Sequence, residues 1–183
     1  MAISSTPACE LVALGATVER ADRDDDPVHC LVMQIRRATS SVLLRCPTSL
    51  GAMATALVTG GTSGIGAEFA RQLAARGDDL VLVARNVDRL AEFATELKDQ
   101  YGVAVETVAA DLGVRDEVLQ VAARLGSTEQ PIELLVNNAG FRTPRILATD
   151  DTSAQEYGID VMVRAVLILG GAAGKAMKER GRG

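Results

Sequence analysis

The stretch Thr59-Gly60-Gly61-Thr62-Ser63-Gly64-Ile65-Gly66 decides the fold, because its spacing is T-G-x-x-x-G-x-G. It follows an apolar run, TALVT at residues 55–59, and precedes a helical pattern at residues 67–76. Glycines in such a turn allow a sharp exit from a strand, close backbone approach to a pyrophosphate and tight packing of helix on strand. The helix start also presents free N–H groups and the positive end of the helix dipole. The motif therefore predicts a strand–turn–helix unit that binds the phosphates of a nucleotide cofactor.

Apolar runs and helical patterns alternate along the chain after residue 53. The predicted strands are 55–59, 79–84, 103–109 and 132–136, and the predicted helices are 67–76, 87–100, 115–125 and 152–179. The last helix has a capping-box pattern at Thr152–Gln155 or at Ser153–Glu156. Continuously apolar strands that alternate with helices are typical of a parallel sheet covered on both faces. The sequence predicts an α/β fold with a doubly wound, Rossmann-type parallel sheet.

Composition and charge argue against two classes of partner. The 183 residues include 19 Lys and Arg against 24 Asp and Glu, a net charge of −5, and aromatic residues make up 3%. A chain this acidic and this poor in aromatic side chains is not expected to bind nucleic acid. The uncharged stretch 165–174 is too short to span a bilayer, so no membrane segment is expected. Without a convincing secretory signal, the expected location is the cytoplasm.

Residues 1–52 differ from the rest and are predicted to be a weakly ordered, or non-native, N-terminal extension. They contain all three cysteines and the single His29, but only two of the 17 glycines. Cysteine spacings of 21 and 16 fit neither a disulfide framework nor a zinc site, so no metal is expected. Two apolar runs, 28–35 and 41–46, are candidate short strands. The predicted domain is 53–183, a partial NAD(P)-binding Rossmann domain.

The second predicted strand ends at Arg85, where residues 82–86 read LVARN. Dinucleotide sites that take NAD place an acidic residue here, on the ribose hydroxyls. An arginine can instead bind the 2′-phosphate of NADP and stack on the adenine. The alternative is a solvent-exposed Arg85 paired with Asp88. NADP is therefore the predicted cofactor, and NAD is the less favoured one.

Two further polar motifs follow the third and fourth predicted strands. Asp111-Leu112 comes after the third, and an acid at that position can accept a hydrogen bond from the adenine amino group. Asn137-Asn138-Ala139-Gly140 comes after the fourth, and its amides can pin the ends of the two central strands by hydrogen bonds to backbone. Because all of these motifs lie at carboxyl ends of strands, they are expected to form one site with the glycine turn.

Together these motifs resemble those of the short-chain dehydrogenase/reductase family, and the resemblance covers residues 54–183. Members of that family are Rossmann-fold oxidoreductases that move a hydride between NAD(P) and a carbonyl or alcohol substrate. The resemblance implies that the glycine turn lines the pyrophosphate, that Arg85 binds the NADP phosphate, and that Asn138 lies near the nicotinamide ribose. It also implies that Asp111 and Leu112 flank the adenine. The cofactor-binding residues that it implies are Thr59, Gly60, Thr62, Ser63, Gly64, Ile65, Gly66, Arg85, Asp111, Leu112, Asn138, Ala139 and Gly140.

The chain departs from the family's pattern at the catalytic residues. The family uses an upstream Ser and a Tyr with a Lys four residues on, whose charge lowers the phenol pKa. Here Tyr101 is followed four residues on by Val105, and Tyr157 by Val161. No catalytic residue is therefore predicted. Met162 stands at the apparent position of an Asn that supports a proton-relay water in the family.

The resemblance further implies a sheet truncated after the fourth strand and the long helix, with strand 132–136 at an edge. The predicted function is an NADP-dependent oxidoreductase for a carbonyl or alcohol, inactive as this chain alone. One alternative is a nucleotide-binding fragment without catalytic activity. The other is an oligomerisation partner that associates with a second copy through helix 152–180.

Overall fold

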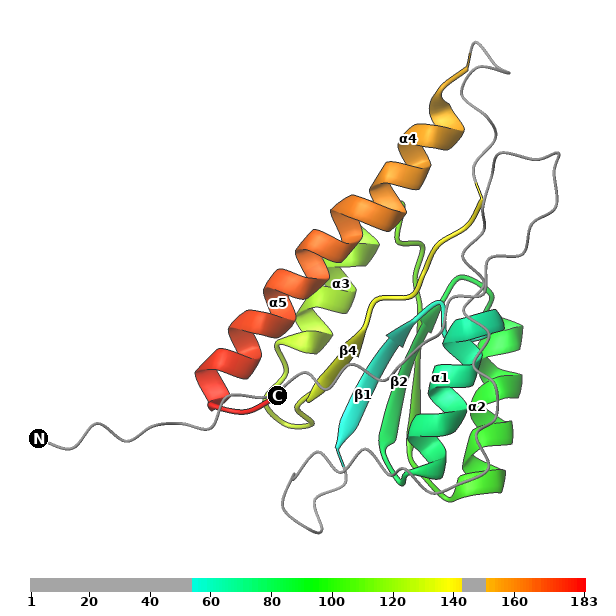
Figure 1. The fold of residues 1–183 in the computed structure, drawn as a ribbon, viewed down its shortest axis with the longest axis vertical. Coiled ribbons are helices and arrows are strands. Elements are labelled where there is room, and N and C mark those ends of the chain that lie inside the picture. The colour runs from blue at the N-terminus through cyan, green and yellow to red at the C-terminus, as the bar shows by residue number, and fades with distance from the viewer. Residues whose placement is uncertain (1–53, 143–150) are drawn as a thin grey trace, which may run out of the picture. The chain divides into compact units, whose positions relative to one another are not determined.

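A four-stranded parallel sheet carries helices on both of its faces (Figure 1). The computed structural model describes residues 54–142 and 151–183, and the extension 1–52 with its candidate strands lies outside the described residues. The strands are β1 (Thr55–Thr59), β2 (Asp79–Ala84), β3 (Val105–Ala109) and β4 (Leu134–Val136). Their order is β3-β2-β1-β4, and each neighbouring pair is parallel. This topology places the ends of β1 and β4 side by side.

Each face of the sheet has its own layer of helices. One face carries α1 (Gly64–Ala75) and α2 (Val87–Tyr101). The other carries α3 (Arg115–Leu125) and a long rod made of α4 (Ser153–Ile159), a π-helical turn η2 (Asp160–Arg164) and α5 (Ala165–Arg180) (Figure 1). The predicted α/β fold, a doubly wound Rossmann-type sheet, is confirmed.

The central strands bury side chains on both faces, since successive strand residues point to opposite sides. The cluster against α1 and α2 includes Ala56, Val58, Leu80, Leu82, Leu90, Phe93 and Leu97. The cluster against α3 and the long rod includes Leu57, Val81, Val83, Val118, Val121, Val161, Ala165 and Leu169. Burial on both faces explains why β1 and β2 read as continuous apolar runs.

Two elements begin at positions that differ from the prediction. α1 begins at Gly64 rather than at residue 67, because Ser63 is the extended N-cap and the glycine turn itself forms the first helical turn. β3 begins at Val105 rather than at residue 103. The backbone N–H of Ala104 donates to Asp79 Oδ1 (2.8 Å), a side-chain partner in place of a strand neighbour.

The fourth strand and the start of the long helix also differ from the prediction. β4 is shorter than the predicted 132–136, although the N–H of Glu133 still donates to the carbonyl of Thr55 (2.9 Å). The predicted capping box is wrong in both registers. Thr152 is the N-cap residue, but its side chain makes no capping hydrogen bond to the first turn of the helix. Its hydroxyl donates to Glu156 Oε1 instead (2.8 Å).

β3 and β4 are the two edges of the sheet within the described residues, and the predicted edge position of the fourth strand is confirmed. Leu134 of β4 is 37% exposed. Glu133, just before the strand, pairs with Arg182 (3.2 Å). Sheet edges are usually protected from pairing with other chains by charged side chains, bulges or covering segments. The Glu133–Arg182 ion pair places charged side chains beside the start of β4.

The helical rod from Ser153 to Arg180 is 28 residues long and contains a stretch of mean hydropathy 1.4, enough by length and composition to cross a membrane. The sequence argument considered only the uncharged stretch 165–174 and so underestimated the apolar length. One face of the rod packs against α3 through Val161, Ala165 and Leu169. A core helix, which is mostly buried, also meets this criterion, whereas 28% of this stretch is buried. The absence of a membrane segment remains a prediction.

Candidate functional site

The turn between β1 and α1 leaves the start of α1 open. Ser63 caps the helix in an extended conformation (φ −156°), its side chain makes no capping hydrogen bond, and no acidic residue lies in the first turn. The helix therefore does not neutralise its own free N–H groups or its positive dipole end. Gly64 has φ +54°, and a Cβ there would meet nothing within 4 Å. This open, positively polarised helix start suits a phosphate group.

Two other glycines of the turn are required by packing. Gly60 has φ +65°, and a Cβ there would lie 2.9 Å from the Cα of Ala139. A Cβ at Gly66 would overlap the carbonyl of Gly60 and the side-chain amide of Asn138. Glycine at both positions lets the start of α1 approach the loop after β4.

Thr59, which is 1% exposed, joins the ends of β1 and β4. Its Oγ1 accepts from the backbone N–H groups of Asn138 (3.0 Å) and Ala139 (3.1 Å). The same hydroxyl donates to the carbonyl of Val136 (3.3 Å). The side chain of Asn138 donates to the carbonyls of Thr59 (3.1 Å) and Gly60 (3.2 Å). Of the two amides in the motif, that of Asn138 therefore pins the two strand ends, as the sequence predicted.

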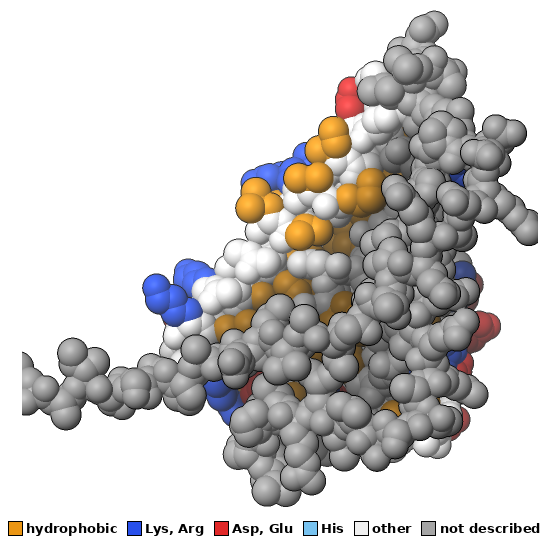
Figure 2. All heavy atoms as spheres, in the orientation of Figure 1, with side chains coloured by type: hydrophobic (Ala, Val, Ile, Leu, Met, Phe, Trp, Pro, Cys, Tyr) orange, Lys and Arg blue, Asp and Glu red, His pale blue; other side chains and the backbone are white. Residues whose placement is uncertain are grey.

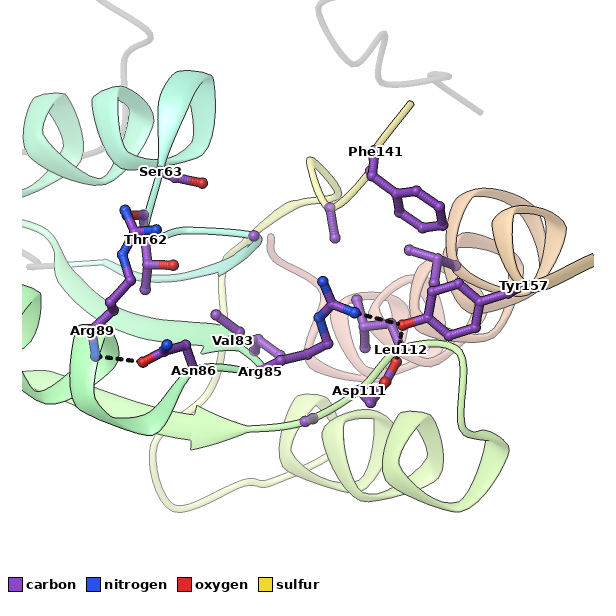
Figure 3. A pocket seen from close by; sticks show the side chains of 16 residues that line it. Thr62, Ser63, Val83, Arg85, Asn86, Arg89, Asp111, Leu112, Phe141 and Tyr157 are labelled. Atoms are coloured by element: carbon purple, nitrogen blue, oxygen red, sulfur yellow. Dashed lines mark hydrogen bonds between the residues drawn. The ribbon is translucent and has the colours of Figure 1, made fainter. Parts of the chain in front are cut away.

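A cavity of about 250 Å³ lies at the carboxyl end of the sheet, between the glycine turn, the ends of β2 and β3, and α4 (Figure 3). The predicted site residues that line it are Gly60, Thr62, Ser63, Arg85, Asp111, Leu112, Ala139 and Gly140. Those that lie outside its lining are Thr59, Gly64, Ile65, Gly66 and Asn138. Of these, Ile65 is 70% exposed at the helix start, whereas Gly66 is buried. The structure thus brings most of the predicted residues to one hollow.

Tyr157 of α4 connects the ends of β2 and β3 at this cavity (Figure 3). Its hydroxyl donates to Asp111 Oδ1 (2.5 Å) and accepts from Arg85 Nη1 (3.1 Å). Burial raises the pKa of Tyr157, the hydrogen bond to Asp111 and its charge raise it further, and Arg85 lowers it. The phenol is therefore protonated at neutral pH and can serve as the donor to Asp111.

Sequence reasoning missed several side chains of the cavity. Asn86 caps α2 by accepting from the backbone N–H of Arg89 (2.9 Å), and Arg89 Nη2 donates to the carbonyl of Thr62 (3.2 Å). An Asn directly before a predicted helix is a favoured N-cap, and this signal could have identified Asn86 as the cap of α2. Tyr157 and Phe141, whose ring centroids are 5.3 Å apart, carried no local signal.

The described contacts also bear on two other side chains that the sequence analysis singled out, Arg85 and Met162. No ion pair links Arg85 to Asp88 in residues 54–142 and 151–183, and Arg85 instead bonds to Tyr157. Met162 lies in η2, where its Sδ would be 3.5 Å from a Cβ placed on Gly140. No group of three or more His, Cys, Asp or Glu side chains that could hold a metal was found in the described part of the chain.

Comparison with known proteins adds sequence and structural relatives. A family model described as short chain dehydrogenase matches residues 54–183. An uncharacterized oxidoreductase of Staphylococcus saprophyticus is 37% identical over 112 residues, which cover 61% of this chain and 48% of that protein. The chain thus spans about half the length of this curated relative.

Solved structures give the same picture. A short-chain dehydrogenase from Sphingobium yanoikuyae in complex with NADPH matches with a TM-score of 0.68 and 37% identity, over 72% of this chain and 51% of that one. L-sorbose reductase from Gluconobacter frateurii, complexed with NADPH and L-sorbose, matches with a TM-score of 0.65 and 35% identity. That match covers 71% of this chain and 49% of the reductase.

Proposed function

The chain belongs to the short-chain dehydrogenase family, and we propose that it binds NADP as part of an oxidoreductase that acts on a carbonyl or alcohol. In this proposal residues 53–183 are a partial NAD(P)-binding domain and residues 1–52 are an extension to it. The two similar structures described with NADPH support a nicotinamide cofactor.

The observation that carries the proposal is the open start of α1 beside the cavity. Thr62 and Ser63 line the cavity next to the free N–H groups, and Gly64 leaves room for a ligand to approach the backbone. These features suit a pyrophosphate, which is anionic and needs donors rather than a protein carboxylate. Asp111 and Leu112 line the cavity on the side away from the glycine turn (Figure 3) and would flank the adenine.

NADP is preferred over NAD in this proposal because of the charges that line the cavity. Arg85 and Arg89 both line it, and Asp111 is the one acidic residue among its lining residues in the described chain. An arginine at the end of β2 favours a ribose 2′-phosphate, whereas NAD sites have an acid there. Arg89, in the first turn of α2, adds a second positive charge to the lining of the cavity.

When bound, NADP would supply the hydride acceptor or donor. The residues of this chain bind and orient, and we propose that they do not complete the acid–base chemistry. The hydroxyl of Tyr157 already donates its hydrogen bond to Asp111, and its raised pKa makes the phenol a weak acid, so it is a poor proton donor to a carbonyl. We therefore propose that the chain alone is inactive on carbonyls. This inactivity is also what the alternative function predicts, a nucleotide-binding fragment without catalytic activity.

The experiment compares NADPH and NADH binding by calorimetry on the 183-residue chain and on two variants. We expect tighter binding of NADPH, and Arg85→Asp should abolish or invert the preference. Lys98→Asp makes the same charge change in the last turn of α2, away from the cavity, and should leave the preference intact. Equal affinities in the unmodified chain would exclude Arg85 from the role, and absence of binding would contradict the proposed function. Sustained NADPH oxidation with ketones would contradict the proposed inactivity.

We also propose that the long helical rod mediates association of two copies of the chain. Its outer face exposes apolar side chains at helical spacing, and Figure 2 shows hydrophobic side chains along this rod. The exposed residues are Ile159, Met162, Val163, Val166 and Leu167. Further along α5 the rod contains three glycines, Gly170, Gly171 and Gly174. A Cβ at any of these positions would meet nothing within 4 Å. An exposed apolar face of this kind marks a surface at which another protein can pack.

A further inference from the structure

Tyr157 occupies a place that the proposed cofactor roles do not explain. It lies on α4, 46 residues from Asp111 and 72 from Arg85, yet it hydrogen-bonds to both. Arg85 follows β2 and Asp111 follows β3, so the phenol is the one described side chain that bonds to both of these neighbouring strand ends.

The two bonds leave the functional atoms of both partners available. Tyr157 and the backbone N–H of Gly113 both bond to Oδ1 of Asp111, so neither of them uses Oδ2. The bond from Arg85 uses Nη1, one of the donors of a guanidinium that has five N–H groups. Each partner is thus held at one atom while others can face a ligand.

The phenol ring is itself held in place. A Cβ at Gly113 would overlap its Cε2 and Cδ2 atoms, so the ring packs directly against the backbone after β3. The ring of Phe141 also lies beside it, with ring centroids 5.3 Å apart and an angle of 37° between the ring planes. Because these two neighbours hold the ring, its hydroxyl can position a long, exposed arginine side chain that otherwise has many rotamers.

We propose that Tyr157 is a positioning residue for NADP selectivity, which holds the guanidinium of Arg85 and the carboxylate of Asp111 in place around the adenosine end of the cofactor. This inference rests on the proposed function. Holding Arg85 before the ligand arrives reduces the ordering cost of binding a 2′-phosphate. The cavity of about 250 Å³ is present with Tyr157 among its lining residues. Tyr157 therefore borders the space that a ligand would occupy and does not fill it.

The test measures the ratio of NADH and NADPH dissociation constants in four 183-residue proteins: the parent, Tyr157→Phe, Arg85→Ala and the double variant. Tyr157→Phe keeps the packed ring and removes only the hydroxyl. We expect it to lower the ratio about three- to tenfold, the range expected for one hydrogen bond. In the Arg85→Ala background the same change should leave the ratio unaltered. Tyr101→Phe, which changes the other tyrosine, is the matched control and should keep the parent ratio.

A second measurement leaves Tyr157 in place. The 2′-phosphate of NADPH would engage Arg85 and add negative charge nearby, so NADPH should move the ultraviolet titration of Tyr157 to higher pH than NADH does. An unchanged ratio in Tyr157→Phe, an equal loss in both backgrounds, or identical titrations with both nucleotides would overturn the inference alone. Tighter binding of both nucleotides to Tyr157→Phe would also overturn it, since the phenol would then occlude the adenine. Failure of the parent to bind either nucleotide would overturn the proposed function as well.

Discussion

The hydroxyl of Thr59 accepts a hydrogen bond from the backbone N–H of Asn138 at 3.0 Å and thereby ties the last residue of β1 to the loop after β4. The side chain of Asn138 returns the contact by donating to the carbonyl of Thr59 at 3.1 Å. These reciprocal bonds are formed by residues 79 apart in the chain. They fix the loop that carries Ala139 and Gly140 into the cavity wall.

Replacing Thr59 by Val should destabilise the fold at this junction. The change keeps the side-chain shape but leaves the half-buried N–H groups of Asn138 and Ala139 without their acceptor. We expect the free energy of unfolding to fall by about 1–3 kcal/mol, measured by urea denaturation. Thr55→Val, the same change at the half-buried start of β1, should have a much smaller effect. Equal losses in the two variants would show that the hydroxyl of Thr59 is not important.

Gly113→Ala should displace the ring of Tyr157, because the added Cβ would overlap it. Overpacking of this kind costs about 1–3 kcal/mol, which chemical denaturation can measure. The tyrosine signal in near-ultraviolet circular dichroism should also change. Gly126→Ala, at the other end of α3, is the control, since φ there is −81° and the nearest atom to its Cβ is 3.5 Å away. A native tyrosine signal in Gly113→Ala would contradict the packing described for Tyr157.

The raised pKa of Tyr157 predicts a loss of stability in alkaline solution. Below the ordinary tyrosine value of 10.0, the phenol is protonated in both folded and unfolded chains and its contribution is complete. As the pH rises above that value, the unfolded chain loses the proton first, so the free energy of unfolding falls until the folded pKa is passed. Tyr157→Phe should show a shallower fall above pH 10 than the parent. Identical slopes in the two proteins would count against the raised pKa.

Leu167→Lys should prevent the proposed association through the helical rod. Leu167 is 76% exposed, so the charge should not disturb the folded monomer but would be buried between two copies. Sedimentation velocity should show dimers for the parent and monomers for the variant. Leu119→Lys, an exposed position on α3, should remain dimeric. A parent that stays monomeric at every concentration would refute the proposal.

Deleting residues 1–52 should leave the sheet nearly as stable as before. β1, the first described strand, already has β2 on one side and β4 on the other. We expect the melting temperature to change by less than about 4 °C, which for a domain of this size is roughly 1 kcal/mol. A larger drop would show that the extension is part of the folded domain.

The parts of the fold that the sequence predicted are those specified by local patterns. β1 and β2 are buried on both faces, so their apolar runs are unambiguous, and the glycine turn requires an open helix start. Tyr157 could not be predicted, because its partners come from other elements and only the packing of α4 brings them together. The π-helical turn at Asp160–Arg164 also has no local signature. It is stabilised by tertiary contacts such as Arg164 Nη2 with the carbonyl of Gly113 (3.2 Å). The cytoplasmic location remains a prediction.

The long rod also determines where the chain travels after β4. It leaves the carboxyl end of β4 and returns to the level at which that strand begins, where Arg180 Nη2 donates to the carbonyl of Ile132 (2.6 Å). The C-terminus lies beside the start of β4 in Figure 1. A strand that entered the sheet beside β4 from this level would run parallel to β4, as the three other described strands do. A strand donated by another molecule could enter from either end.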